Sequence, residues 1–107
     1  MTRAVVSPGN CGISVTVEVV KVGKQGVRVE ITSDCEMITK MGESLAELNL
    51  LDALKPPVNS EVYKCASEYH LCASCPVPMA ILKAIEIEAG LALPRPVLVH
   101  FETTEQG

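Results

Sequence analysis

Aromatic residues are scarce in this chain, which has one Phe, two Tyr and no Trp among 107 residues. A platform that stacks the bases of single-stranded nucleic acid is therefore not expected. A basic surplus is also missing, because the formal net charge is −4, and this disfavours nucleic acid and anionic membranes as partners. No apolar run is long enough to span a bilayer or to serve as a signal peptide. We therefore expect a cytoplasmic protein that binds neither nucleic acid nor membrane.

What the chain does have is aliphatic side chains, with 48% of its residues apolar. This fraction is enough for a core built from Val, Ile, Leu, Met and Ala without obligatory disulfides. The length falls within the usual range of one domain, so we predict a single domain over residues 1–107.

Two stretches show the alternation of apolar and polar residues that is typical of half-buried strands. They cover residues 13–19 and 27–32, and residues 23–26 between them predict a hairpin turn. With a four-residue turn, Ser14 faces Cys35 at the open end of the hairpin. The polar residues on both strands predict that one face of the sheet meets water.

Three stretches have apolar residues at helical spacing. The first helix is expected to start at residues 33–36, a capping box, and to continue to residues 48–54. The second is expected over residues 60–69, and the third from the 72–78 segment to Gly90, which suits a C-terminal cap.

The two ends of the chain complete the predicted order. Residues 1–10 are expected to form a short leader that ends in a turn, and residues 97–102 alternate as a last strand. The order β-β-α-α-α-β predicts the α+β class, with a small antiparallel or mixed three-stranded sheet and helices packed on one face.

The five cysteines suggest where chemistry takes place. In a reducing cytoplasm, thiols serve more often as metal ligands, redox groups or buried apolar residues than in disulfides. Cys72 and Cys75 form a Cys-x-x-Cys pair that can place two sulfurs on one ion. Cys35 and Cys75 lie at predicted helix starts, which favour bound anions, and Cys11 lies with Cys35 at the open end of the hairpin.

We therefore predict a metal centre bound by cysteine thiolates. Its ligands are Cys11, Cys35, Cys72 and Cys75, with His70 and Cys65 as further candidates. The expected group is an iron–sulfur cluster, with zinc as the second choice, although neither a compact ferredoxin run nor zinc-ribbon spacing is present. The role would be cluster carriage, electron transfer or metal-dependent interaction with a protein partner.

Other interpretations of the same residues stay open. A dithiol redox or sensor protein would use Cys72 and Cys75 without metal. The thiols can also be inert, since buried cysteine behaves as a small hydrophobe, and Cys65 lies on an apolar helix face. No Gly-x-Ser-x-Gly motif or phosphate-binding loop is present, so we assign no catalytic residue and leave open whether the protein is an enzyme.

A cofactor-free interaction domain is the third interpretation. The water-facing side of the sheet or an edge strand would then contact a protein partner or a second subunit, as in a homodimer.

Two motifs carry a resemblance to a known family. Cys72-Ala73-Ser74-Cys75-Pro76-Val77-Pro78 and Gly90-Leu91-Ala92-Leu93-Pro94, together with Ile81-Leu82-Lys83-Ala84, resemble a family of small uncharacterised proteins from anaerobic archaea and bacteria. The resemblance extends to Cys11-Gly12 and Ser33-Asp34-Cys35. It implies no catalytic residue, but an anaerobic source favours an iron–sulfur cluster over zinc. The chain is also faintly similar to iron–sulfur scaffold proteins of the U type, although their characteristic aspartate is missing here.

Overall fold

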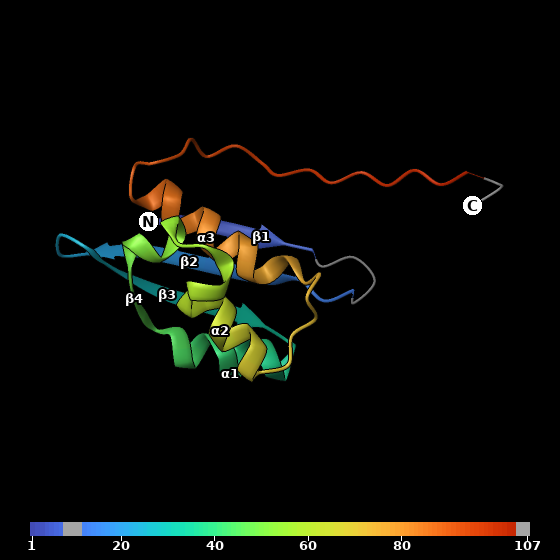
Figure 1. Cartoon of the computed structure of the whole chain (residues 1–107), viewed down its shortest axis with the longest axis horizontal. Helices are drawn as coiled ribbons and strands as arrows, with labels where there is room; N and C mark the ends of the chain where they lie inside the picture. The colour runs from blue at the N-terminus through green and yellow to red at the C-terminus, as the bar shows by residue number, and fades with distance from the viewer. Residues whose placement is uncertain (8–11, 105–107) are drawn as a thin grey trace.

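The structure is a computed structural model that describes residues 1–7 and 12–104. Within these residues, four strands, three α-helices and two short 3-10 helices follow one another along the chain (Figure 1). In order they are β1 (Thr2–Val6), β2 (Val15–Val22), β3 (Gly26–Ser33), α1 (Glu36–Leu45), β4 (Glu47–Asn49), η2 (Leu50–Leu54), η3 (Pro57–Asn59), α2 (Glu61–Glu68) and α3 (Pro76–Glu88).

The sheet is antiparallel, with its strands in the order β1-β2-β3-β4. The predicted α+β class is confirmed, but the prediction of three strands is wrong. The chain gains β4 because α1 ends at Leu45, earlier than expected, and Glu47–Asn49 then pairs with β3. The helical turn predicted up to residue 54 is η2, a 3-10 helix.

The interpretation of residues 1–10 as a leader is also wrong for the residues that the structure describes. Thr2–Val6 forms β1 and pairs with β2, with Val6 opposite Val15. Val6 is buried and Ala4 half-buried on the helix side, whereas Arg3 and Val5 are exposed. Five residues of alternation are too short to stand out in the sequence, but pairing with a strand already in place stabilises them.

The hairpin between β2 and β3 differs from the prediction by one residue. Val22 pairs with Gly26 and Val15 with Ser33, so the loop has three residues. Gly23 adopts a positive φ of 67°, which suits glycine. Gly26 begins β3 and pairs with Val22. Glycine suits this position because a Cβ there would lie 2.8 Å from the carbonyl oxygen of Val22.

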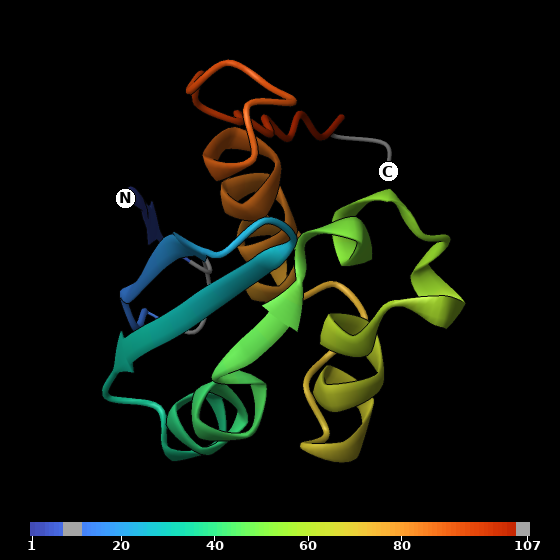
Figure 2. The same ribbon diagram turned by 90° about the vertical axis from the view of Figure 1, so that its left-hand side faces the viewer.

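The helices lie on one face of the sheet and the core lies between them (Figures 1 and 2). The period-2 pattern of the strands supplies one side of this core, and the helical stripes supply the other. Its most buried large members are Val15, Val17, Val19, Val27, Met41, Val62, Val77, Ile81 and Ile85. On the other face, Arg28 and Glu30 are exposed, as the alternation predicted.

The last strand, predicted over residues 97–102, is absent from the described residues. The chain leaves α3 at Ala89 and continues as an extended, exposed segment without regular secondary structure (Figure 1). Alternation alone does not make a strand, because the pattern is stabilised only beside a hydrogen-bonding neighbour.

Candidate functional site

The end of the sheet opposite the 23–25 loop carries the chain segments that contain the predicted ligands. Val6, Val15 and Ser33 form one row across β1, β2 and β3. Adjacent strands lie about 4.8 Å apart, so this row is about 10 Å wide. We call this end of the strands the thiol end. From it the chain continues from Ser33 to Cys35, and from Val6 into the connection that contains Cys11.

Cys35 is the N-cap residue of α1, which begins at Glu36. The predicted capping box is not formed, since the hydroxyl of Ser33 accepts a hydrogen bond from the backbone N–H of Cys35 at 3.0 Å. Thr39 closes the first turn by donating its hydroxyl to the carbonyl oxygens of Ser33 and Cys35, each at 3.0 Å. The Cys35 side chain makes no capping bond and is half-buried against the core. Cys35 therefore stands at a helix N-terminus, where backbone N–H groups lack intrahelical partners.

Cys75 is the N-cap residue of α3, and Pro76 takes the first helical position, within the 72–78 segment where the sequence predicted the helix to start. The preceding residues form a turn in which the backbone N–H of Cys75 donates to the carbonyl oxygen of Cys72 at 3.0 Å. A turn of this kind holds its first and fourth Cα atoms within about 7 Å. Cys72 is exposed, whereas Cys75 is half-buried against the core.

The length of α3 brings Cys75 to the thiol end. At the far end of the helix, the Glu88 carboxylate accepts hydrogen bonds from the backbone N–H of Lys21 at 2.9 Å and the hydroxyl of Thr2 at 2.8 Å. From Lys21 back to Val15 is about 20 Å along β2. The 13 residues of α3 also span about 20 Å, so the helix begins at the end of the sheet where β2 begins (Figure 1). Cys35 and Cys75 thus lie at the same end of the sheet.

His70 lies just after α2 and caps the C-terminal end of this helix. It is exposed and has a φ of 58°, in the left-handed region. Its N–H donates to the carbonyl oxygen of Ser67 at 3.1 Å, and the N–H of Leu71 donates to that of Ala66 at 3.0 Å. This pair of bonds is the Schellman motif, with His70 at the position that usually holds glycine.

Cys65 lies in the core, on the buried face of α2. Its Sγ is 3.8 Å from the carbonyl oxygen of Met41. Burial raises the pKa of the Cys65 thiol, and the nearby charge of Glu68 raises this pKa further. Both effects favour the protonated thiol, which is neither a metal ligand nor a nucleophile.

The described cysteines do not complete a metal site by themselves. Among residues 1–7 and 12–104, no group of three or more His, Cys, Asp or Glu side chains is arranged to hold a metal ion. Cys35, Cys72 and Cys75 therefore do not gather as a set of three. The remaining predicted ligand, Cys11, lies outside the described residues. A centre at the thiol end needs Cys11 together with at most two of these three.

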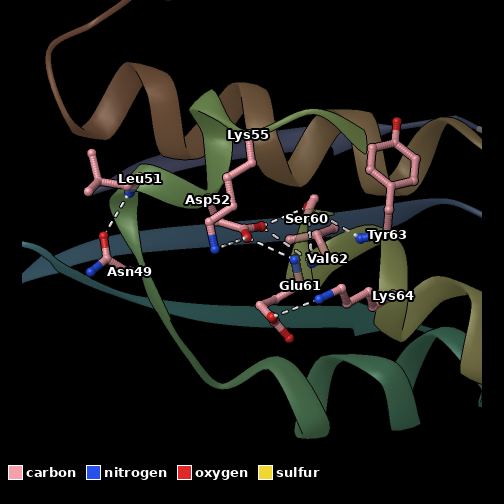
Figure 3. Close-up of polar contacts among 9 residues, drawn as sticks. All are labelled: Asn49, Leu51, Asp52, Lys55, Ser60, Glu61, Val62, Tyr63 and Lys64. Atoms are coloured by element: carbon pink, nitrogen blue, oxygen red, sulfur yellow. Dashed lines mark hydrogen bonds and ion pairs between the residues drawn. The ribbon is translucent and has the colours of Figure 1, made fainter. Parts of the chain in front are cut away.

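The sequence analysis missed a buried carboxylate at Asp52, which is only 1% exposed. Figure 3 shows its contacts with the start of α2. The carboxylate accepts hydrogen bonds from the hydroxyl of Ser60 at 2.7 Å and from the backbone N–H groups of Glu61 at 2.8 Å and Val62 at 3.3 Å. Lys55 lies 3.7 Å away as an ion-pair partner.

This arrangement is structural, because Asp52 and Ser60 together cap α2. Ser60 is the N-cap residue of α2, and its hydroxyl also accepts from the N–H groups of Val62 and Tyr63. The one sequence signal for Asp52 was a charged residue inside the apolar run Leu50–Leu54. That signal gives no partner, because Ser60 is eight residues away and only the fold brings the two together.

The fold thus defines a small α+β protein with cysteines at the N-termini of two helices. Comparison with protein-family models places the chain in DUF6951, a family of unknown function whose model matches residues 2–101. The predicted resemblance to small uncharacterised proteins is in keeping with this match, which gives no support to the similarity with U-type iron–sulfur scaffolds.

Two further comparisons returned no match, one with curated proteins and one with solved structures. Within the described part of the chain, none of the helices is both long enough and apolar enough to cross a membrane.

Proposed function

We propose that this protein is a small module that binds a metal centre through Cys11, Cys35 and Cys75. The observation that carries the proposal is that Cys35 and Cys75 are the N-cap residues of two helices that start at the thiol end. Helix N-termini carry partial positive charge and unpaired N–H groups, which favour thiolate and sulfide. A reducing cytoplasm, the expected location, keeps such thiols available.

The choice of ligands follows from burial. Because Cys35, Cys72 and Cys75 do not gather as a set of three, we assign the two half-buried thiols to the centre and leave out the exposed Cys72. Cys65 is left out because it is buried in the core, and His70 because it is exposed and caps α2.

Three thiolates suit either of the two expected groups. An iron–sulfur cluster would supply electron transfer or a cargo for delivery, whereas zinc would supply a structural or partner-binding centre. The chain's own residues hold the ligands: Thr39 fixes the first turn of α1 through its two carbonyl contacts, and Pro76 fixes the start of α3.

The experiment is to measure metal and acid-labile sulfide, with a visible spectrum, on protein purified without oxygen. Cys35→Ser and Cys75→Ser should each lose the metal, and the loss should lower stability because binding energy adds to folding energy. Cys72→Ser should keep it. Cys65→Ala is the matched control, since it removes a thiol from the core and not from the thiol end. Full metal content in both Cys35→Ser and Cys75→Ser would refute this assignment.

The turn between Cys72 and Cys75 favours a second candidate, a dithiol redox or sensor protein. The Cα separation of such a turn, within about 7 Å, is compatible with the 4.4–6.8 Å that a disulfide needs. Two thiols would form one S–S bond and release two protons, and an added mild oxidant would accept the two electrons.

The two candidates predict opposite results in the same variants. For the dithiol, metal-free protein loses two titratable thiols on mild oxidation and regains them on reduction. Cys72→Ser abolishes this change, whereas Cys35→Ser preserves it. If metal-free protein keeps all its thiols under mild oxidation, the dithiol candidate is wrong.

A further inference from the structure

The C-terminal part of the chain is extended and carries much of the protein's exposed apolar surface. We call residues 97–101 the C-terminal arm. Its apolar side chains are 52% to 89% exposed: Val97, Leu98, Val99 and Phe101. Among the described residues, the one side-chain polar contact of this segment is local: the His100 imidazole lies 3.5 Å from the carboxylate of Glu102. A run of four large apolar residues in five is not typical of a solvated tail.

The edge of the sheet at β1 is open. β1 pairs with β2 on one side, and on the other side no strand of the described residues pairs with it. Such an edge presents unpaired N–H and C=O groups to any extended segment that approaches. The exposed face of β1 carries the apolar Val5, which is 72% exposed, next to the charged Arg3.

A groove separates the open edge from the C-terminal arm. It has a volume of about 860 Å³ and is lined by β1, by α3 and by residues from Pro94 to Phe101. α3 ends beside Thr2, so the chain turns back there, and the arm runs in the same direction as β1 across the groove (Figure 1). The groove therefore lies between two extended segments whose directions agree.

The exposed area of the chain is larger than expected for a compact monomer. A compact monomer of this mass is expected to expose about 5,800 Å². This chain exposes 7327 Å², an excess of about 1,500 Å². A standard protein interface takes about 800 Å² from each partner, which is less than this excess.

We propose that the C-terminal arm of a second copy occupies this groove, so that two copies exchange arms across a two-fold axis. The second copy's arm would lie between β1 and the first copy's own arm. A two-fold axis perpendicular to the sheet reverses the direction of the partner's arm, so this arm would run antiparallel to both neighbours. The order across the dimer would be β1, partner arm, own arm, partner β1, and the two sheets would join in one antiparallel sheet without an open edge at β1.

The second copy fits better than closure of the arm onto its own β1. That closure would make a parallel pair, which is slightly less stable per residue than an antiparallel one, on a sheet that is antiparallel throughout its described strands. Pro94 and Pro96 precede the arm and stiffen the connection to it. The family match also covers both elements, since it begins at residue 2 in β1 and ends at residue 101 in the arm.

Sedimentation equilibrium of the full chain over a range of concentrations tests this proposal. We expect a dimer whose dissociation constant rises at least tenfold in Val99→Asp, because a carboxylate would replace a buried apolar side chain. Val58→Asp is the matched control, since Val58 is 79% exposed on η3, away from the groove, and the dimer should be unchanged.

Hydrogen exchange on the same samples identifies the contact. Protection of the arm and β1 amides should rise with protein concentration in the wild type and should not rise in Val99→Asp. A monomer at all concentrations overturns the proposal, whether its arm is protected by closure on its own β1 or exposed for another partner. A dimer that Val99→Asp leaves intact overturns it as well. These outcomes are independent of the metal content, which is measured separately.

Discussion

The Asp52 cluster allows a sharp test of the fold. Asp52→Asn keeps the size and shape of the side chain but replaces one carboxylate oxygen with an NH₂ group. Both oxygens of Asp52 accept hydrogen bonds, Oδ1 from the N–H of Glu61 and Oδ2 from Ser60 and the N–H of Val62. In either orientation of the amide, the new donor therefore faces at least one existing donor.

The expected cost can be worked out from these contacts. A hydrogen bond to a charged group contributes about 1.5–3 kcal/mol, and at least one is lost. The negative charge at the N-terminus of α2 adds about 0.3–1 kcal/mol. The ion pair with Lys55 adds little, because the lysine side chain is 42% exposed. We therefore expect Asp52→Asn to lower the free energy of unfolding by about 2–4 kcal/mol.

Urea unfolding followed by circular dichroism measures this loss. With a slope of about 2 kcal/mol per molar urea, the midpoint should fall by about 1–2 M. Asn49→Ala is the matched control, because Asn49 also caps a helix, accepting from the N–H of Leu51 at 2.9 Å, but is exposed. It should cost about 1 kcal/mol or less. If Asp52→Asn costs no more than Asn49→Ala, the reasoning about the buried carboxylate is wrong.

Two further predictions concern His70 and Glu88. Because His70 has a φ of 58°, His70→Gly should raise the free energy of unfolding by about 0.5–1 kcal/mol in urea unfolding. The metal content should not change. A loss of stability would contradict the capping role. The hydrogen bond from the backbone N–H of Lys21, and then the one from the hydroxyl of Thr2, lower the pKa of Glu88. The ionised Glu88 therefore stabilises the fold above the usual carboxyl pKa of about 4.3, and this stabilisation is lost as the pH falls through the lowered pKa. Glu88→Gln should therefore be less stable than the wild type at pH 7 and show a smaller loss between pH 5 and strongly acidic pH; parallel stability curves would refute this.

Much of the site could be predicted from local sequence, because capping is a local property. Pro76 and the Cys-x-x-Cys pair predicted the start of α3, and the Ser33 region predicted the start of α1. The exact cap at Cys35 was not predicted, since Ser33 bonds the N–H of Cys35 and so moves the helix start along the chain. The sequence analysis also missed His70 as a helix cap, because histidine has only a weak preference for positive φ.

The sequence alone determined the α+β class, the β2–β3 hairpin and the three helices of the described chain. These depend on periods of two and 3.6 residues and on turns and caps, which neighbouring residues decide. The tertiary structure decided what depends on distant partners: the strands β1 and β4, the register of their pairing, and the hydrogen bond between Ser60 and Asp52. It also left the arm at residues 97–101 without a strand neighbour in the described chain, although its alternation is that of a strand. Pairing energy is gained only between segments that the fold brings together, so no local pattern can specify it.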